Sequence, residues 1–316
     1  MNTKVNFRGK TGILFIAVMA VLLMVIAAAP ASAVLQAAGP ISTVHGFPTY
    51  YQDTTGLAIQ LCLGVNADGT GLGDPNCVLG AGENPALPIA FPNNFPAEAF
   101  YYLADADTPK IGPAQVTLAF RLALEGAFTG DPAPNTQTVF LRTNLRVSKV
   151  GATNGLTASS TYTFTHPFGV ITCTTDALGD ITTCADANGN GGGGAQAYRV
   201  EDGAFAPPLT AITAASFLAA PLTGFGPYLK AVSPAPPAGY IGNPAVAQTI
   251  QPGPNGAALV INGPNIDPLN ADGLGDANRL TITNWFVAGK IAVIDTIPPV
   301  IGATLICVTP RPDASP

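Results

Sequence analysis

The amino-acid sequence predicts an all-β protein with little helix, folded as an antiparallel β-sandwich of the immunoglobulin or jelly-roll kind. Three observations lead to this prediction. Several segments alternate apolar and polar residues with a period of two, the pattern of half-buried strands. Gly and Pro supply 35 and 30 of the 316 residues, so turns are frequent. Charged residues make up only 10% while apolar residues reach 47%, which argues against a helical bundle or a charged disordered chain.

Alternation predicts strands along the whole chain. The clearest alternating segments are residues 57–63, 116–124, 139–147, 161–165 and 280–287, and a turn at Ala288-Gly289 is expected to lead into a last strand at 291–294. The Pro-rich segments between them must be connections or edge strands, because proline cannot donate a hydrogen bond to a central ladder. Only residues 97–106 could instead form a short helix.

Composition also suggests how the chain is divided. We expect a signal peptide at 1–33, a β-sandwich region at 34–184, and a Gly- and Pro-rich connection at 185–210. A second β region at 211–298 follows, and 299–316 form a C-terminal tail or final strand. The two β regions could form two packed subdomains or pack as one domain.

Residues 1–33 have the features of a secretory signal peptide. Lys4, Arg8 and Lys10 precede an apolar run over 12–29, and residues 31–33 (Ala-Ser-Ala) form the small-x-small cleavage pattern. A retained membrane anchor is the alternative, since the run borders on spanning length. Pro30 and the cleavage pattern directly after the run favour cleavage. The mature chain would then carry 10 basic and 19 acidic residues, a net charge of −9, and would be secreted or held at the cell surface without a membrane span.

Export predicts that some of the five cysteines form disulfides, because disulfides persist in oxidising compartments. Cys62 and Cys77 flank a Gly- and Asp-rich loop, and we expect them to pair. Cys173 and Cys184 flank a predicted hairpin that turns near Leu178-Gly179, and we expect a second disulfide there; four buried free thiols are the alternative. Cys307 is left as a free thiol, either buried in a final strand or exposed and able to cross-link two chains.

Several segments of the chain resemble known proteins. The segments HGFPTYYQDTTGLAIQLCL, DPNCVL, FPNNFPAEAFYYLADAD, TYTFTHPFGV and GPYLKAV…NWFVAGKI resemble a group of uncharacterised exported bacterial proteins of the cell surface, some followed by immunoglobulin-like modules. The similarity spans most of residues 45–294 and implies secretion and β architecture, but no catalytic residue. The Cys173–Cys184 hairpin and the Gly run after it look like an insertion. DTIPPV, from Asp295, resembles the junctions that lead into immunoglobulin-like repeats.

Few residues point to catalysis. The net charge of −6 argues against nucleic-acid binding, which needs a basic face. The sequence has no GxSxG, HExxH or phosphate-binding loop motif. Of the two histidines, His166 is expected to be a turn residue whose ring caps backbone groups, and His45 has still less claim to a catalytic role. The four glutamates share no motif, although two of them could meet in the fold as a glycosidase pair.

Acidic loops are the more specific signal, and they point to calcium. Residues 66–76 and 270–278 share an N-A-D-G…L-G-D-x-N pattern, and a third segment, 184–194, opens like a calcium loop but has Ala197 where the bidentate Glu belongs. Carboxylate and amide oxygens are suitable calcium ligands; ordinary turn formation by Asp, Asn and Gly is the alternative. The candidate ligands are Asp68, Asp74, Asp272, Asp276, Asp186, Asn188 and Asn190.

Two classes of function follow. The leading hypothesis is an exported, non-enzymatic structural or adhesive protein of the cell surface or the extracellular matrix. The alternative is a calcium-stabilised polysaccharide-binding module, which could use exposed members of the aromatic groups at 50–51, 100–102 and 285–286, although packing explains most of these residues. A secreted hydrolase is third. The expected partners are a polysaccharide, a surface protein or another copy of the chain.

Overall fold

The all-β prediction is confirmed. A computed structural model describes residues 35–65, 74–78, 84, 86–151, 154–186, 198–202 and 226–294, and within these ranges every regular element is a strand. Nearly all strand pairs are antiparallel. In the described ranges no helix is long and apolar enough to cross a membrane. The predicted signal peptide, Cys307 and the C-terminal segment lie outside the described residues.

The largest sheet has eight strands and is built around three long ones. Its hydrogen-bonded order is β13-β9-β8-β6-β18-β15-β14, and β7 also pairs with β8. The strands are β6 (Glu98–Ala106), β7 (Lys110–Ile111), β8 (Val116–Phe128), β9 (Gln137–Val147), β13 (Tyr198–Asp202), β14 (Ala231–Ser233), β15 (Gln248–Ile250) and β18 (Asn284–Ala288). The segment 97–106, which could have been a helix, therefore contains β6, a strand at the centre of this sheet.

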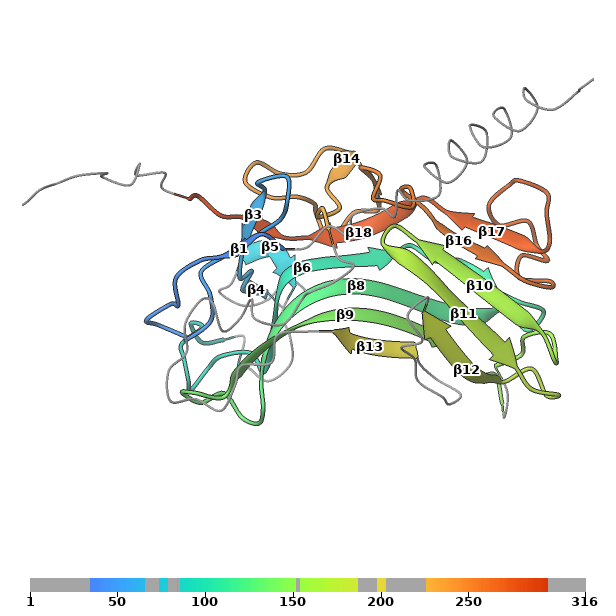
Figure 1. The fold of residues 1–316 in the computed structure, drawn as a ribbon, viewed down its shortest axis with the longest axis horizontal. Coiled ribbons are helices and arrows are strands. Elements are labelled where there is room, and N and C mark those ends of the chain that lie inside the picture. Colours follow the sequence, from blue (N-terminus) through green and yellow to red (C-terminus); the bar gives the residue numbers. More distant parts are fainter. Residues whose placement is uncertain are drawn as a thin grey trace, which may run out of the picture.

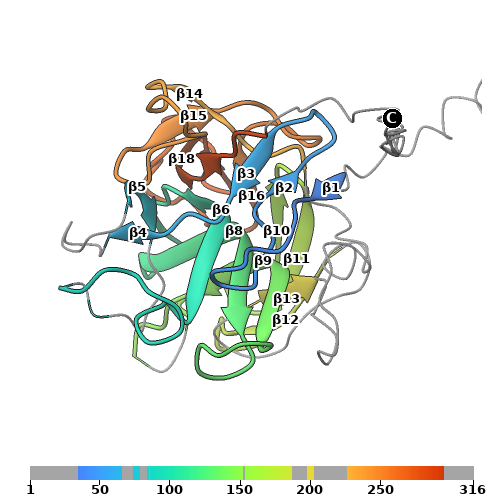
Figure 2. The ribbon, with the colours of Figure 1, turned by 90° about the vertical axis from the view of Figure 1, so that its left-hand side faces the viewer.

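A second sheet has five strands in the order β12-β11-β10-β16-β17. Its strands are β10 (Thr161–His166), β11 (Gly169–Thr175), β12 (Ile181–Asp186), β16 (Leu259–Asn262) and β17 (Arg279–Ile282). Figures 1 and 2 show this sheet lying against one end of the long strands β6, β8 and β9. Both sheets contribute to one core, an arrangement consistent with a β-sandwich.

Two small sheets complete the fold. The four-stranded one has the order β1-β2-β3-β19, and β4 and β5 form a short parallel pair. The strands are β1 (Ala37–Ala38), β2 (Tyr51–Gln52), β3 (Ala58–Gln60), β4 (Gly64–Val65), β5 (Asp74–Val78) and β19 (Lys290–Ile291). At Ala288-Gly289, where a turn was expected, the chain instead passes from one sheet to another, because Gly289 connects β18 of the large sheet to β19 of this small one.

Alternation along the long strands decides which side chains enter the core. Val116, Leu118, Phe120, Leu122 and Leu124 of β8 are all at most 2% exposed, while the residues between them face the other way. At one end Phe120 packs against the rings of His166 and Trp285, with centroid distances of 5.2 and 6.2 Å. At the other end Phe128 packs against Phe47 at 5.1 Å. The core therefore runs the full length of β8.

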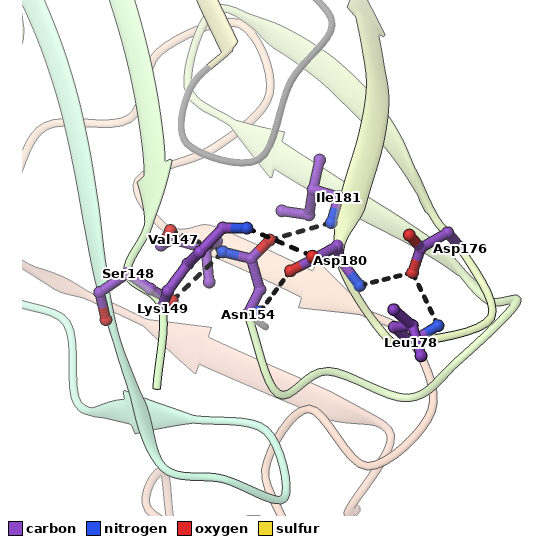
Figure 3. A network of polar contacts seen from close by, with 8 residues as sticks. All are labelled: Val147, Ser148, Lys149, Asn154, Asp176, Leu178, Asp180 and Ile181. Carbon is purple, nitrogen blue, oxygen red and sulfur yellow. Dashed lines mark hydrogen bonds and ion pairs between the residues drawn. The ribbon is translucent and has the colours of Figure 1, made fainter. Parts of the chain in front are cut away.

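A buried amide joins the large sheet to the five-stranded one (Figure 3). Asn154 is fully buried; its amide nitrogen donates to the carbonyl oxygens of Val147 and Ser148 at 3.0 and 3.2 Å, and its Oδ1 accepts from the backbone of Ile181 at 3.0 Å. Asp180 accepts from the Asn154 backbone at 2.6 Å and pairs with Lys149 at 3.2 Å. Because Val147 ends β9 and Ile181 begins β12, these bonds fix the two sheets relative to each other.

Both expected disulfides are present. Cys62 and Cys77 lie with their Cα atoms 5.3 Å apart, and Cys173 and Cys184 are register partners on β11 and β12 at 4.1 Å. The hairpin between the second pair turns where predicted, and Gly179 adopts φ +80 there. A Cβ at this glycine would collide with the Leu156 carbonyl oxygen, so the position requires glycine. The two disulfides are compatible with an extracellular location.

Candidate functional site

The outer face of the large sheet, which points away from the core, is the candidate site. Antiparallel register places residues from neighbouring strands in rows across this face. One row runs from Phe286 on β18 through Asp105 on β6 and Arg121 on β8 to Asn144 on β9. The next row contains Leu103, Ala123 and Arg142. Charged and amide side chains from three strands are thus side by side.

Asp105 and Arg121 form a two-pronged ion pair on this face. The Nε and Nη2 atoms of Arg121 donate to Oδ1 and Oδ2 of Asp105, both at 2.7 Å. This parallel geometry is the strongest form of an arginine–carboxylate contact. The hydrogen bonds from Arg121 to Asp105 raise the pKa of the guanidinium still further above its usual value. The guanidinium is therefore charged at physiological pH, and the two bonds hold both side chains in fixed orientations.

Two glutamates meet at Arg142 in the neighbouring part of the face. Arg142 Nη1 lies 2.8 Å from Oε2 of Glu125, which is fully buried, and Nη2 lies 3.4 Å from Oε1 of the half-exposed Glu98. The guanidinium also lies 4.9 Å from the centre of the Phe140 ring. The fold thus brings together two of the four glutamates, as the glycosidase hypothesis required, and places an arginine in contact with both.

Beside these pairs the face is hollowed. A depression of about 360 Å³ is lined by Asp105, Ala106, Leu118, Ala119, Phe120, Arg121, Asn144 and Arg146. The side chain of Arg146 is exposed, and Asn144 is partly buried with an Oδ1 atom that is buried and accepts no hydrogen bond. The depression therefore presents a guanidinium, an amide and the methyl group of Ala119 in one place. It is large enough to hold one small polar unit of a ligand.

Of the predicted calcium ligands, Asp74, Asp186, Asp272 and Asp276 lie in the described part of the chain, and no three of them form one group. Asp68, Asn188 and Asn190 lie outside the described residues, and Asp186 ends β12. Asp74 pairs with Lys290 at 2.7 Å and accepts a hydrogen bond from the Tyr240 hydroxyl. Burial raises the pKa of Asp74, but the bonds from Lys290 and Tyr240 outweigh it and lower the pKa. Among the described residues, no three His, Cys, Asp or Glu side chains form a group that could hold a metal ion.

The loop at 270–278 is organised by an aspartate that lies just before it. Asp267, 2% exposed, accepts hydrogen bonds from the backbone of Ala271 at 2.7 Å and of Asp272 at 3.3 Å. Asp272 in turn accepts from Leu274 at 2.9 Å and from Thr281 at 2.8 Å. Asp276 accepts from the backbone of Asn278 at 2.9 Å. The carboxylates of this loop thus satisfy backbone groups, as the turn-forming alternative expects. The most buried carboxylate, Asp267, lies outside the repeated sequence pattern and was not among the predicted ligands.

Neither histidine lies in the depression. His166 is 6% exposed, its ring packs on Phe120, and its Nδ1 accepts a bond of 3.4 Å from the Phe168 backbone, as expected for a turn residue. Burial lowers the pKa of His166 to about 4, although Asp186 acts in the opposite direction. Burial also lowers the pKa of His45, whose ring lies against Phe47 and Phe95. Both rings are neutral at pH 7.

Most of the aromatic residues pack in the interior. Tyr51, Tyr101, Tyr102 and Trp285 are fully buried, and burial raises the pKa of the three tyrosines well above its usual value. Phe100 is also buried, on the outer face, in a small cluster that includes Leu103 and Ala123. An exposed aromatic platform is not formed by these residues, so the polar depression is the better candidate for ligand contact.

We predict that replacing Asp267 by alanine destabilises the protein. The substitution removes the acceptor for two backbone N–H groups in a buried turn, which costs about 1–3 kcal/mol of unfolding free energy. Chemical denaturation measures this loss, and Asp131→Ala, at an exposed turn position, is the matched control. Equal stability of the two variants would contradict a structural role for Asp267.

Calcium remains a prediction of the sequence with a direct test. If the loop at 270–278 binds the ion, millimolar calcium raises the melting temperature relative to chelator, because the metal binds only the native state. Magnesium should substitute poorly, since it demands a tighter octahedral geometry. Asp272→Asn should then lose part of the calcium effect, and a melting temperature that does not respond to calcium would leave the loop as an ordinary turn.

The buried His166 predicts a loss of stability in acid. Its pKa is about 4 in the native state and about 6.5 in the unfolded chain, so between these values the unfolded state binds a proton that the native state does not. Stability is complete above pH 6.5 and falls by about 3 kcal/mol as the pH drops to 4. Denaturation curves of His166→Gln should show a shallower acid decline than the parent, and His45→Gln a smaller change. Parallel pH profiles for His166→Gln and the parent would contradict this account.

Comparison with known protein families, with curated proteins and with solved structures gives no match to this chain.

Proposed function

We propose that this chain is an exported, non-enzymatic adhesive protein of the cell surface or the extracellular matrix, and that it adheres to polysaccharide through the depression on the outer face of the large sheet. The observation that carries the proposal is the lining of the depression. Arg146 is exposed there, Asn144 has a buried oxygen that accepts no hydrogen bond, and Ala119 leaves room between the strands. Polar groups beside small apolar ones suit a sugar ring, which has both kinds of surface.

The disulfides and the rigid sheet support a role for a stable protein outside the cell. Two disulfides each close a short loop of chain, and in the chain-entropy model such a link stabilises by about 3 kcal/mol. The depression lies on paired strands of a sheet, and strands hold side chains in more definite positions than loops do. The Asp105–Arg121 pair fixes one wall of it. A rigid, pre-arranged surface loses little conformational freedom on binding.

The described carboxylates also support binding over catalysis. Asp105 is paired with Arg121, Glu98 and Glu125 contact Arg142, and Asp74 pairs with Lys290. A catalytic carboxylate has to reach a substrate, whereas each of these carboxylates is held by a neighbouring cation. The two glutamates at Arg142 therefore have a structural explanation.

We predict that the purified protein is retained on at least one immobilised polysaccharide and that Asn144→Ala weakens this retention. Loss of one hydrogen bond to a sugar hydroxyl corresponds to a roughly fivefold weaker affinity. Asn262→Ala is the matched control, because Asn262 is exposed and lies on β16 of the five-stranded sheet. Retention should be measured across a panel of plant, bacterial and matrix polysaccharides.

Two results would overturn this proposal. Failure to bind any polysaccharide in the panel would remove the adhesive role assigned to the depression, as would equal weakening by Asn144→Ala and Asn262→Ala. Release of reducing sugar ends during the incubation would replace it by the hydrolase hypothesis, and Glu98→Gln would then be the first variant to examine.

A further inference from the structure

The charges that line the depression do not balance. Asp105 is satisfied by Arg121 through both of its oxygen atoms, each at 2.7 Å, so that pair is neutral as a unit. Arg146 is the remaining charged residue of the lining, and within the described part of the chain it forms no ion pair or side-chain hydrogen bond. Its guanidinium is a surplus positive charge with five donors in a planar fork. An ionised carboxylate is the group that matches this fork in charge and shape.

Asn144 adds a second requirement. Its Oδ1 atom is buried and accepts no hydrogen bond, and a buried acceptor without a donor is costly unless a ligand or water supplies one. Because the atom is buried, the amide has to turn toward the depression before a ligand hydroxyl can donate to it; a second carboxylate cannot donate at all. The ligand unit should therefore carry both a carboxylate and a hydroxyl group.

The spacing of these two residues fits one compact unit. Asn144 and Arg146 are two residues apart on β9, so they share a face and their Cα atoms lie roughly 7 Å apart. Their register partners on β8 are Arg121 and Ala119. Ala119 presents only a methyl group on this face, which leaves space for a ring above it. The next strand continues the row, since Arg199 of β13 is the register partner of Asn144.

We infer that the depression recognises a uronic-acid unit of an acidic polysaccharide, with the sugar carboxylate on Arg146 and a ring hydroxyl donating to Asn144. This inference rests on the proposed function and names its ligand class. The fixed guanidinium of Arg121 and the carboxylate of Asp105 form the far wall, where further ring hydroxyls can donate to Asp105. The methyl group of Ala119 contacts the C–H face of the ring.

The test compares one oligosaccharide in two forms. Oligogalacturonate and the same oligomer with its carboxyl groups methyl-esterified differ in charge and in one added methyl group per unit, so calorimetric titration of the purified protein with each compares a charged with a neutral carboxyl group. The inference expects binding of the acid form to be about ten- to a hundredfold tighter, the value of one charge-assisted hydrogen-bonded pair. Arg146→Gln should remove this preference, and Arg146→Lys should restore only part of it, because lysine cannot form the planar fork.

Arg279→Gln is the matched control, since Arg279 is also exposed but lies on β17 of the five-stranded sheet. It should leave the preference for the acid form unchanged. Equal affinity for the acid and the ester, or an acid preference that survives in Arg146→Gln, overturns the inference while leaving polysaccharide binding in place. Because Arg146 is exposed and outside the core, melting temperatures of the variants should match that of the parent, which separates a binding defect from misfolding.

Discussion

The antiparallel pairing of β8 with β9 is the constraint on which the rest of the structure depends. Eleven register pairs join these two strands, and each strand alternates core and outer residues along its length. A slip of one residue in this register would exchange the two faces of one strand and bury its charges in the core. The same pairing that assembles the core therefore also assembles the outer face. Arg121 stands beside Asn144, and Ala119 beside Arg146, only in this register.

Charge on the outer face strengthens that constraint. Glu125 is fully buried and Arg142 nearly so, and they lie 2.8 Å apart. A buried charge whose partner is removed costs about 3–5 kcal/mol, so an alternative pairing that separates these two side chains is strongly disfavoured. The pair adds little net stability compared with apolar residues of the same volume, but it penalises the wrong register. The Asp105–Arg121 pair, which is about one-third exposed, contributes less energy and mainly sets side-chain orientation.

The sequence allowed the elements to be predicted better than their arrangement. Period-two alternation located β8, β9 and β10, and the positions of Cys173 and Cys184 around a Gly-containing turn located their disulfide. Alternation failed at 100–102, because a bulge between Phe100 and Tyr102 turns both Tyr101 and Tyr102 into the core. A bulge depends on the partner strand, and no local pattern shows it.

The candidate site could be predicted only in part for the same reason. The polar phase of 116–124 and 139–147 includes Arg121, Asn144 and Arg146, but their proximity depends on the register between strands, which follows from the core as a whole. The acidic loops were more visible in the sequence because their residues are contiguous. There, the carboxylate that organises the loop is Asp267, outside the repeated pattern, since burial rather than motif decides which aspartate holds the backbone.

The positive charge of Arg146 in the depression is opposite in sign to the net charge of the molecule. The chain as a whole carries a net charge of −6, which repels polyanions at long range. At physiological ionic strength the screening length is about 8 Å, so charges elsewhere on the surface act weakly at Arg146 while a bound carboxylate in contact with it is hardly screened. An acidic protein can therefore bind an acidic sugar through one short-range pair, without attracting the polymer as a whole. Under the proposed function, such a contact discriminates by the position of the carboxylate within the sugar unit and not by the charge density of the polymer, because the pair acts only at short range.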